Sequence, residues 1–427
     1  MLTEKIIDSY TRILEAELVP AMGCTEPIAL AYAGAKAREV LGTLPEKVIA
    51  KCSGNIIKNV RCVTIPNSRN LVGIEAGVML GIVGGNAQKQ MEVLEDVAEE
   101  DIEQTKDLLK KGVCKVEYLD SPSVLHIILE LYTEEHSAVV EIRDGHTNIT
   151  SMRKDGTELL EHAAALEEDD TDERKVILNM ENIKEFADTV ELYRVEALIQ
   201  RQIDYNMAIS NEGMKGGYGL GLGKILVESY PDTTLNQMKA YAAAGSEARM
   251  GGCDLPVIIN SGSGNQGIAS SVPVIIYARI KQIPRETLLR SLVFSNLLTI
   301  YQKTYIGKLS AFCGAVSASC ASGAALTYMV GGTLEQIQMT VENTLANIPG
   351  IICDGAKISC AAKIATSLDA AIMAHTLAMQ GKVYAPYTGI LQEDTPETIS
   401  CVGYIGKEGM KQTDKEILKI MIDHNEE

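Results

Sequence analysis

The sequence contains no tryptophan, and only 4% of its 427 residues are aromatic. Its interior must therefore be built from Ala, Val, Ile, Leu and Met, and 36 glycines allow close backbone approach. The chain also lacks an excess of basic residues, because its net charge is −18. This charge argues against nucleic acid or an anionic membrane as a partner, since both require basic surface.

No segment has the pattern of an export signal or a membrane span. Residues 1–24 predict a charged amphipathic helix rather than a basic region followed by an apolar run. The most apolar window is residues 71–85, which is shorter than the ~20 apolar residues of a spanning helix. We therefore expect a cytoplasmic protein whose ten cysteines are reduced thiols, metal ligands or catalytic groups.

The hydrophobic pattern predicts an α+β protein in which helices predominate. Helices are expected over residues 3–17, 25–41 and 71–85, and short strands over 46–55 and 59–68. From residue 180 onward the pattern is again helical.

Near residue 96 the sequence changes from apolar helical segments to a charged helix and β-branched runs. This change predicts a second, smaller domain. A charged helix ending at Gly112 is followed by β-branched runs and an Asp144-Gly145 turn, which predict antiparallel strands. We expect an inserted α+β domain over 96–172 and a helical catalytic domain formed by 1–95 and 173–427. The acidic stretch 167–174 is expected to be a solvated linker.

Two cysteines lie seven positions apart in IICDGAKISC, residues 351–360. In one continuous helix this spacing is a rise of about 10 Å, too far for both thiols to share a small metal centre. Asp354 is a good N-cap, however, so Cys353 is expected before a helix and Cys360 in its second turn. Both sulfurs can then point to one centre at the helix N-terminus, which favours thiolates. The alternative is two buried structural thiols.

Cys24 immediately precedes a helix that Thr25 can cap and that has Pro27 in its first turn. A thiol at a helix N-terminus is expected to have a lowered pKa, which is how a reactive cysteine is usually made. The alternative is a small residue that fills a tight turn.

Cys313 and Cys320 are also seven positions apart, on a segment that predicts one unbroken helix. The rise between them allows at most one to join a given centre, and the spacing does not indicate which. The absence of any C-x-x-C pair argues against a zinc ribbon. The remaining cysteines are expected to be structural: Cys52, Cys62, Cys114, Cys253 and Cys401.

The loop SGSGNQG, residues 261–267, has the glycine spacing of a dinucleotide-binding motif. No parallel βαβ unit surrounds it, so we expect a different role. Its backbone amides and side chains are expected to hold a carboxylate or an amine of a small substrate, through Ser263, Gly264, Asn265 and Gln266. A plain turn is the alternative. The six histidines form no metal-binding or triad-like spacing, and we assign them no role.

Four stretches together resemble the L-cysteine desulfidase family, which belongs with the iron–sulfur L-serine dehydratase alpha chains. They are GCTEP at 23–27, SGSGNQG at 261–267, CGAVSASC at 313–320 and PGIICDGAKISCAAK at 349–363. The resemblance covers nearly the whole chain, and the combination is specific although no single motif is.

The resemblance implies an oxygen-sensitive 4Fe–4S cluster held by Cys313, Cys353 and Cys360, with Cys24 as the general base and no pyridoxal phosphate. Three thiolates leave one iron with an open position that can act as a Lewis acid. An alternative role for Cys24 is to bind that iron in the resting enzyme.

The implied reaction is β-elimination of L-cysteine to pyruvate, ammonia and sulfide, and L-serine dehydration is the alternative. Serine-specific relatives carry a separate β domain and an S-H-x-x-G-P motif, and the absence of that motif here favours cysteine. Two rivals are a pyridoxal-phosphate lyase, with 261–267 as phosphate cradle, and a metabolite-binding regulatory protein without catalysis. We expect a small amino acid as substrate and a homodimer as the assembly.

Overall fold

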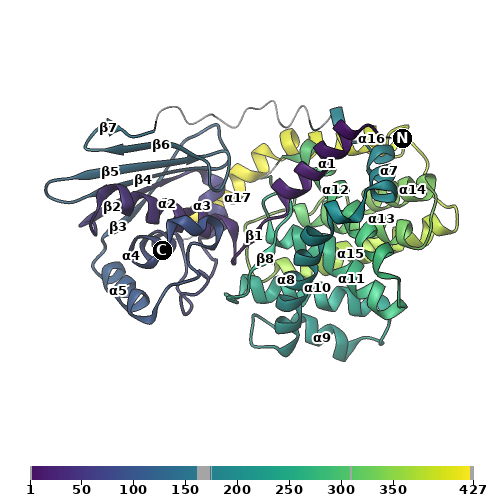
Figure 1. Cartoon of the computed structure of the whole chain (residues 1–427), viewed down its shortest axis with the longest axis horizontal. Helices are drawn as coiled ribbons and strands as arrows, with labels where there is room; N and C mark the ends of the chain where they lie inside the picture. Colours follow the sequence, from purple (N-terminus) through teal and green to yellow (C-terminus); the bar gives the residue numbers. More distant parts are fainter. Residues whose placement is uncertain (1, 161–173, 175, 308–309, 424–427) are drawn as a thin grey trace.

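The computed structural model describes residues 2–160, 174, 176–307 and 310–423. In Figure 1 a β-sheet with its covering helices lies on one side, and a larger assembly of helices lies on the other. The protein has the predicted α+β class with helices predominating. Of the expected acidic linker, all but Arg174 lies outside the described residues.

The helices of the N-terminal half are α1 (Glu4–Glu17), α2 (Thr25–Leu41), α3 (Gly54–Val60), α4 (Ile74–Gly84) and α5 (Glu99–Lys110), with the short η1 (Ala87–Glu92). Those that follow are α7 (Met180–Thr189), η2 (Leu192–Arg194), α8 (Glu196–Lys215), α9 (Leu222–Ser229), α10 (Thr234–Met250), α11 (Gly264–Lys281), α12 (Arg285–Ile306), α13 (Gly314–Met329), α14 (Leu334–Asn347), α15 (Cys360–Met379), α16 (Thr395–Tyr404), η3 (Ile405–Gly409) and α17 (Lys411–Asp423). None of the described helices combines the length and the apolar composition needed to cross a membrane.

One mixed sheet is built in the order β3-β2-β4-β5-β6-β7. Its strands are β2 (Lys47–Cys52), β3 (Cys114–Tyr118), β4 (His126–Tyr132), β5 (Ser137–Arg143), β6 (Ile149–Lys154) and β7 (Thr157–Glu158). Neighbouring strands are antiparallel except β2 and β3, whose parallel pairing requires the long crossover through α3, α4 and α5. Every second side chain of β4 and β5 is buried, because α2 packs on one face.

The sheet therefore takes one strand, β2, from before residue 96, where the inserted domain was expected to begin. The division at residues 96 and 172 stays a prediction. The strand predicted over 59–68 is wrong, because 54–60 form helix α3 and Thr64 makes only an isolated bridge to Val72. In α3 the apolar side chains of Ile56 and Val60 lie four positions apart on one buried face.

The interior is built from small residues, as the scarcity of aromatic rings predicts. A Cβ at Gly81 would lie 2.1 Å from the carbonyl oxygen of Ala31, and one at Gly213 would lie 2.1 Å from that of Ala244. Helices α2 and α4, and likewise α8 and α10, therefore pack with their backbones in contact at these glycines.

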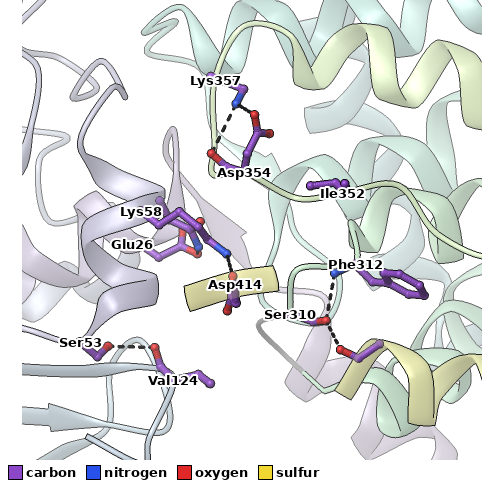
Figure 2. A network of polar contacts seen from close by, with 12 residues as sticks. Glu26, Ser53, Lys58, Val124, Ser310, Phe312, Ile352, Asp354, Lys357 and Asp414 are labelled. Atoms are coloured by element: carbon purple, nitrogen blue, oxygen red, sulfur yellow. Dashed lines mark hydrogen bonds and ion pairs between the residues drawn. The ribbon is translucent and has the colours of Figure 1, made fainter. Parts of the chain in front are cut away.

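Two connections hold the sheet part against the helical part. Strand β1 (Pro20–Ala21) pairs antiparallel with β8 (Val257–Ile258), and both lie between the two parts in Figure 1. Helix α17 brings the described C-terminal end back against α3. Figure 2 shows Lys58 of α3 paired with Asp414 of α17 in an ion pair whose lysine side chain is only 2% exposed. Segments near both ends of the described chain, β1 and α17, thus contribute contacts of this kind.

Candidate active site

A cavity of about 390 Å³ lies between the sheet part and the helical part. Of the residues predicted from the sequence, seven line it: Cys24, Ser263, Asn265, Gln266, Cys313, Cys353 and Cys360. The eighth, Gly264, is the first residue of α11 and lies beside the cavity residue Arg249. The structure therefore brings together residues that are as much as 336 positions apart in the chain, between Cys24 and Cys360.

Cys313 and Cys353 are placed side by side by backbone pairing. The N–H of Cys313 donates to the carbonyl of Ile351 at 2.9 Å, and the N–H of Cys353 donates to that of Ala311 at 2.6 Å. Phe312 and Ile352 form the antiparallel bridge between these two bonds, and both residues are labelled in Figure 2. This short ladder sets the register that places the two cysteines side by side at the cavity.

The helix predicted to begin at Asp354 begins later. Helix α15 starts at Cys360 with Ser359 as its N-cap, so Cys360 lies at the first helical residue rather than in the second turn. Asp354 instead pairs with Lys357 and Lys363, which removes it from a capping role (Figure 2 shows the Lys357 contact). Cys353, at the start of the loop, and Cys360, at its end, nevertheless line the same cavity.

The prediction that Cys313 and Cys320 share one helix is also corrected. Cys313 is the N-cap of α13 and lies outside the helix, whereas Cys320 is fully buried within it. Only Cys313 lines the cavity. The spacing alone did not indicate which of the two cysteines could join a centre, and the structure places only Cys313 at the cavity.

Three lysines surround the cysteine pair with positive charge. The hydrogen bond donated by Cys313 lowers the pKa of Cys353 to about 6, against the effect of burial, and the ammonium groups of Lys58 and Lys363 act in the same direction. Lys303, near the end of α12, is buried beside both sulfurs, and burial lowers its pKa to about 8. The site therefore favours a thiolate at Cys353 only, because the contact with Cys353 and burial raise the pKa of Cys313, and burial raises that of Cys360.

Cys24 is the N-cap of α2, a position predicted for Thr25. Its predicted low pKa is wrong, because burial and the adjacent Glu26 carboxylate raise the pKa of Cys24 well above its ordinary value. The Cys24 thiol donates to Glu26 at 3.2 Å. In this environment the helix N-terminus does not compensate for the loss of water and the nearby negative charge.

Glu26 is a buried carboxylate that accepts hydrogen bonds from two residues besides Cys24. Thr25 Oγ1 donates to it at 2.9 Å and Asn59 Nδ2 at 3.0 Å. Burial opposes ionisation of Glu26, but the nearby His146 and the hydrogen bonds from Cys24 and Thr25 lower its pKa. The Cys24–Glu26 pair therefore rests as a thiol beside a carboxylate.

The loop 261–267 is a tight turn that leads directly into α11. Ser261 and Gly262 both have positive φ, and Asn260 and Ser263 exchange backbone hydrogen bonds across them. A Cβ at Gly267 would lie 2.0 Å from the carbonyl oxygen of Ile258, so this glycine allows α11 to pack on β8. The glycines thus serve turn geometry and close packing, and the first turn of α11 faces the cavity with Asn265 and Gln266.

Four further cavity residues were missed by sequence reasoning: Glu26, His146, Arg249 and Lys303. Glu26 lies two positions after Cys24 in the GCTEP motif, and Arg249 lies with Glu247 in the small-residue run AAAGSEARM. Charged residues in such apolar surroundings are a usable signal of a buried site. His146 and Lys303 carry no comparable signal, because the cavity wall is formed by packing of distant segments.

No set of three or more His, Cys, Asp or Glu side chains in the described part of the chain converges on a point where a single metal ion would sit. The three cavity cysteines that the resemblance assigns to a cluster are thus not a preformed site for one ion.

Residues 88–419 match the family model described as serine dehydratase alpha chain. Similar proteins named UPF0597 protein occur in Lachnoclostridium phytofermentans (48% identical, covering 98% of this chain and 100% of the relative) and in Treponema denticola (45%, covering 97% and 98%). Another in Aeromonas hydrophila is 38% identical and covers 96% of this chain and 95% of the relative. Because both the family model and these relatives span most of its length, the chain belongs to the serine dehydratase alpha chain family.

Proposed function

We propose that the protein is an iron–sulfur-dependent β-eliminating lyase that converts L-cysteine and water to pyruvate, ammonia and sulfide. The observation that carries this proposal is that Cys24, Cys313, Cys353 and Cys360 line one cavity. Membership of the serine dehydratase alpha chain family supports a lyase of this general type.

The residues present fit a 4Fe–4S cluster held by Cys313, Cys353 and Cys360. The donors are soft thiols, two of them in mutual contact, and Lys58, Lys303 and Lys363 supply positive charge to an anionic group. A cluster distributes its thiolates over separate irons, so it does not require the convergence on one point that a single ion does. When bound, such a cluster with three protein ligands supplies a Lewis-acidic iron.

Cys24 is the proposed base for the α-proton of the substrate. Its own proton already points to Glu26, so transfer to that carboxylate produces the thiolate that the role requires. Loss of the α-proton is followed by cleavage of the Cβ–S bond, with the electron pair leaving on sulfur. The remaining aminoacrylate becomes an imine, and water hydrolyses it to pyruvate and ammonia.

The first turn of α11 supports the proposed substrate-binding role of Ser263, Gly264, Asn265 and Gln266. Asn265 is held by a hydrogen bond of 3.0 Å from Ser246, and the Oε1 atom of the buried Gln266 has no partner among the described residues. A polar atom buried in this way without a partner is costly unless a ligand supplies one.

L-Serine is the second candidate substrate, and the description of the matched family model favours it. The two substrates differ only in the β-leaving group, so the carboxylate, amine and α-proton would meet the same residues in either case. The absence of an S-H-x-x-G-P motif favours L-cysteine.

The test is anaerobic reconstitution with iron and sulfide, followed by measurement of iron content and of product release. About four irons per chain, with sulfide and pyruvate formed from L-cysteine, is the expected result. The ratio of pyruvate release from L-cysteine to that from L-serine identifies the substrate. A protein that binds iron but releases pyruvate from neither amino acid contradicts the proposed activity.

A further inference from the structure

Arg249 is a buried cation at the cavity. It lies in the last turn of α10, is only 2% exposed and lines the cavity. Its Nε atom is inaccessible to solvent and has no hydrogen-bond acceptor among the described residues. A buried guanidinium without an acceptor is strongly unfavourable unless a ligand provides the negative charge.

The N-terminus of α11 lies directly against this guanidinium. A Cβ at Gly264, the first residue of α11, would lie 2.3 Å from Nε and 2.7 Å from Cζ of Arg249. The N-cap Ser263 makes no side-chain capping bond, so the first-turn N–H groups of this 18-residue helix keep their capacity to donate. Arg249 and the helix N-terminus thus present converging donors and positive charge to one place.

Another part of the cavity lining carries the complementary charge. The carboxylate of Glu26 lies beside Cys24 and its pKa is lowered, so it suits an ammonium group rather than an anion. Arg249 and Cys24 line the same cavity of about 390 Å³, so one small molecule can contact both. In an α-amino acid the α-carbon is one bond from the carboxylate, so a carboxylate held at Arg249 keeps the α-carbon within this cavity.

We propose that Arg249 and the N-terminus of α11 form the binding subsite for the α-carboxylate of the substrate. The ligand class is therefore a small molecule with a free carboxylate, and the subsite positions its α-carbon for the base. This inference rests on the proposed function for its reaction, but the subsite itself predicts binding whether or not turnover occurs.

The experiment measures binding of pyruvate and of L-alanine, which has no leaving group, to the reconstituted protein and to the cluster-free protein by calorimetry. The Arg249→Gln variant is expected to raise the Kd of both by about 10- to 100-fold, the loss that follows removal of a charge-assisted contact. Gly264→Ala is expected to weaken binding in the same direction, because its Cβ would occupy the space of the guanidinium. The control is Arg279→Gln, which changes an exposed arginine in α11, the helix that begins at Gly264. This variant is expected to keep wild-type binding.

Arg249→Lys keeps the charge without the planar fork and guards against a folding defect in Arg249→Gln. It is expected to bind with intermediate affinity, and thermal unfolding checks that each variant is folded. In turnover assays the Arg249 variants are expected to raise the KM for L-cysteine, and L-cysteine methyl ester is not expected to react with the wild-type enzyme.

The failure of this inference can be told apart from failure of the proposed function. Carboxylate binding that depends on Arg249, in a protein that turns over neither amino acid, supports the subsite and contradicts the lyase. Normal turnover with wild-type Kd and KM in folded Arg249→Gln overturns the subsite and leaves the lyase in place. Absence of carboxylate binding by the wild-type protein in both forms also overturns the subsite.

Discussion

The thiol of Cys24 donates a hydrogen bond of 3.2 Å to the carboxylate of Glu26, two residues further along the chain. Both side chains are buried, Cys24 at 2% and Glu26 at 6% exposure. The proton of the proposed base is therefore already directed at an acceptor. This arrangement differs from a cysteine activated by a cation or a helix N-terminus, because here the negative neighbour keeps the thiol protonated at rest.

Replacing Glu26 by Gln is expected to move the pH profile of kcat/KM towards lower pH. Burial and the charge of Glu26 both raise the pKa of Cys24, and the substitution removes the second cause. If the thiolate is the active form, activity rises as pH rises through this pKa, so a lower pKa shifts the rise to lower pH. The maximal rate is expected to fall, because the proton acceptor is lost. Glu39→Gln, at the exposed end of the same helix, is the control, and an unmoved midpoint in Glu26→Gln would contradict the coupling.

Replacing Cys24 by Ala is expected to reduce pyruvate formation by about 100-fold or more, the usual contribution of a general base. Iron content is expected to stay at the wild-type level, since the cluster ligands are the other three cysteines. Cys62→Ala is the matched control, because Cys62 is exposed and does not line the cavity. A variant that loses iron would instead assign Cys24 to the cluster.

Single replacements of Cys313, Cys353 and Cys360 by Ser are each expected to abolish the broad brown absorbance and most of the bound iron after reconstitution. The matched control is Cys320→Ser, which changes a thiol seven positions from Cys313 that is buried in α13 away from the cavity. Cys320→Ser is expected to keep its iron and to lose about 1–3 kcal/mol of unfolding free energy, because a more polar group is buried. Iron lost equally in all four variants would show that the effect is structural.

Asp414→Asn is expected to lower the free energy of unfolding by about 3 kcal/mol, because it leaves the charge of a buried lysine without compensation. The Lys58 side chain is 2% exposed and that of Asp414 is 18% exposed. The neighbouring pair of Glu408 and Lys411 is far more exposed, so Glu408→Gln should cost less than about 1 kcal/mol. Urea titrations followed by circular dichroism give the unfolding free energy of both variants. Equal losses in the two variants would show that the buried pair contributes no more to stability than the exposed pair.

Sequence reasoning located helices well where strong end signals were present. Helix α2 has the predicted bounds because the turn at Cys24 begins it and Gly42, with φ +87°, ends it. It failed for residues 59–68, where the segment is short. The apolar residues of α3 fit a helical spacing, while Val63 and Ile65 continue an alternation typical of a strand. Short apolar runs satisfy both periods, and only the packing of α3 against α17 distinguishes them.

Site residues could be predicted from the sequence where the residue type itself indicates chemistry, as a cysteine does. Cys24 and Cys360 lie at helix starts that the sequence placed only approximately, since the N-caps are Cys24 and Ser359 rather than Thr25 and Asp354. The pKa of Cys24 was not predictable, because it depends on burial and on the Glu26 carboxylate rather than on helix position alone. His146 was missed for a similar reason, since only the fold carries the β5–β6 connection into the cavity.

The Lys58–Asp414 pair also orders events during synthesis, because its members are 356 positions apart. A ribosome that adds about 5–20 residues per second makes Asp414 roughly 20–70 s after Lys58. During that time the lysine stays solvated, and the crevice beside α3 remains open. Cys360 likewise emerges long after Cys24. The wall of the cavity is therefore completed only when Cys360 has been made, so the proposed cluster would be inserted into a nearly complete chain rather than early in its synthesis.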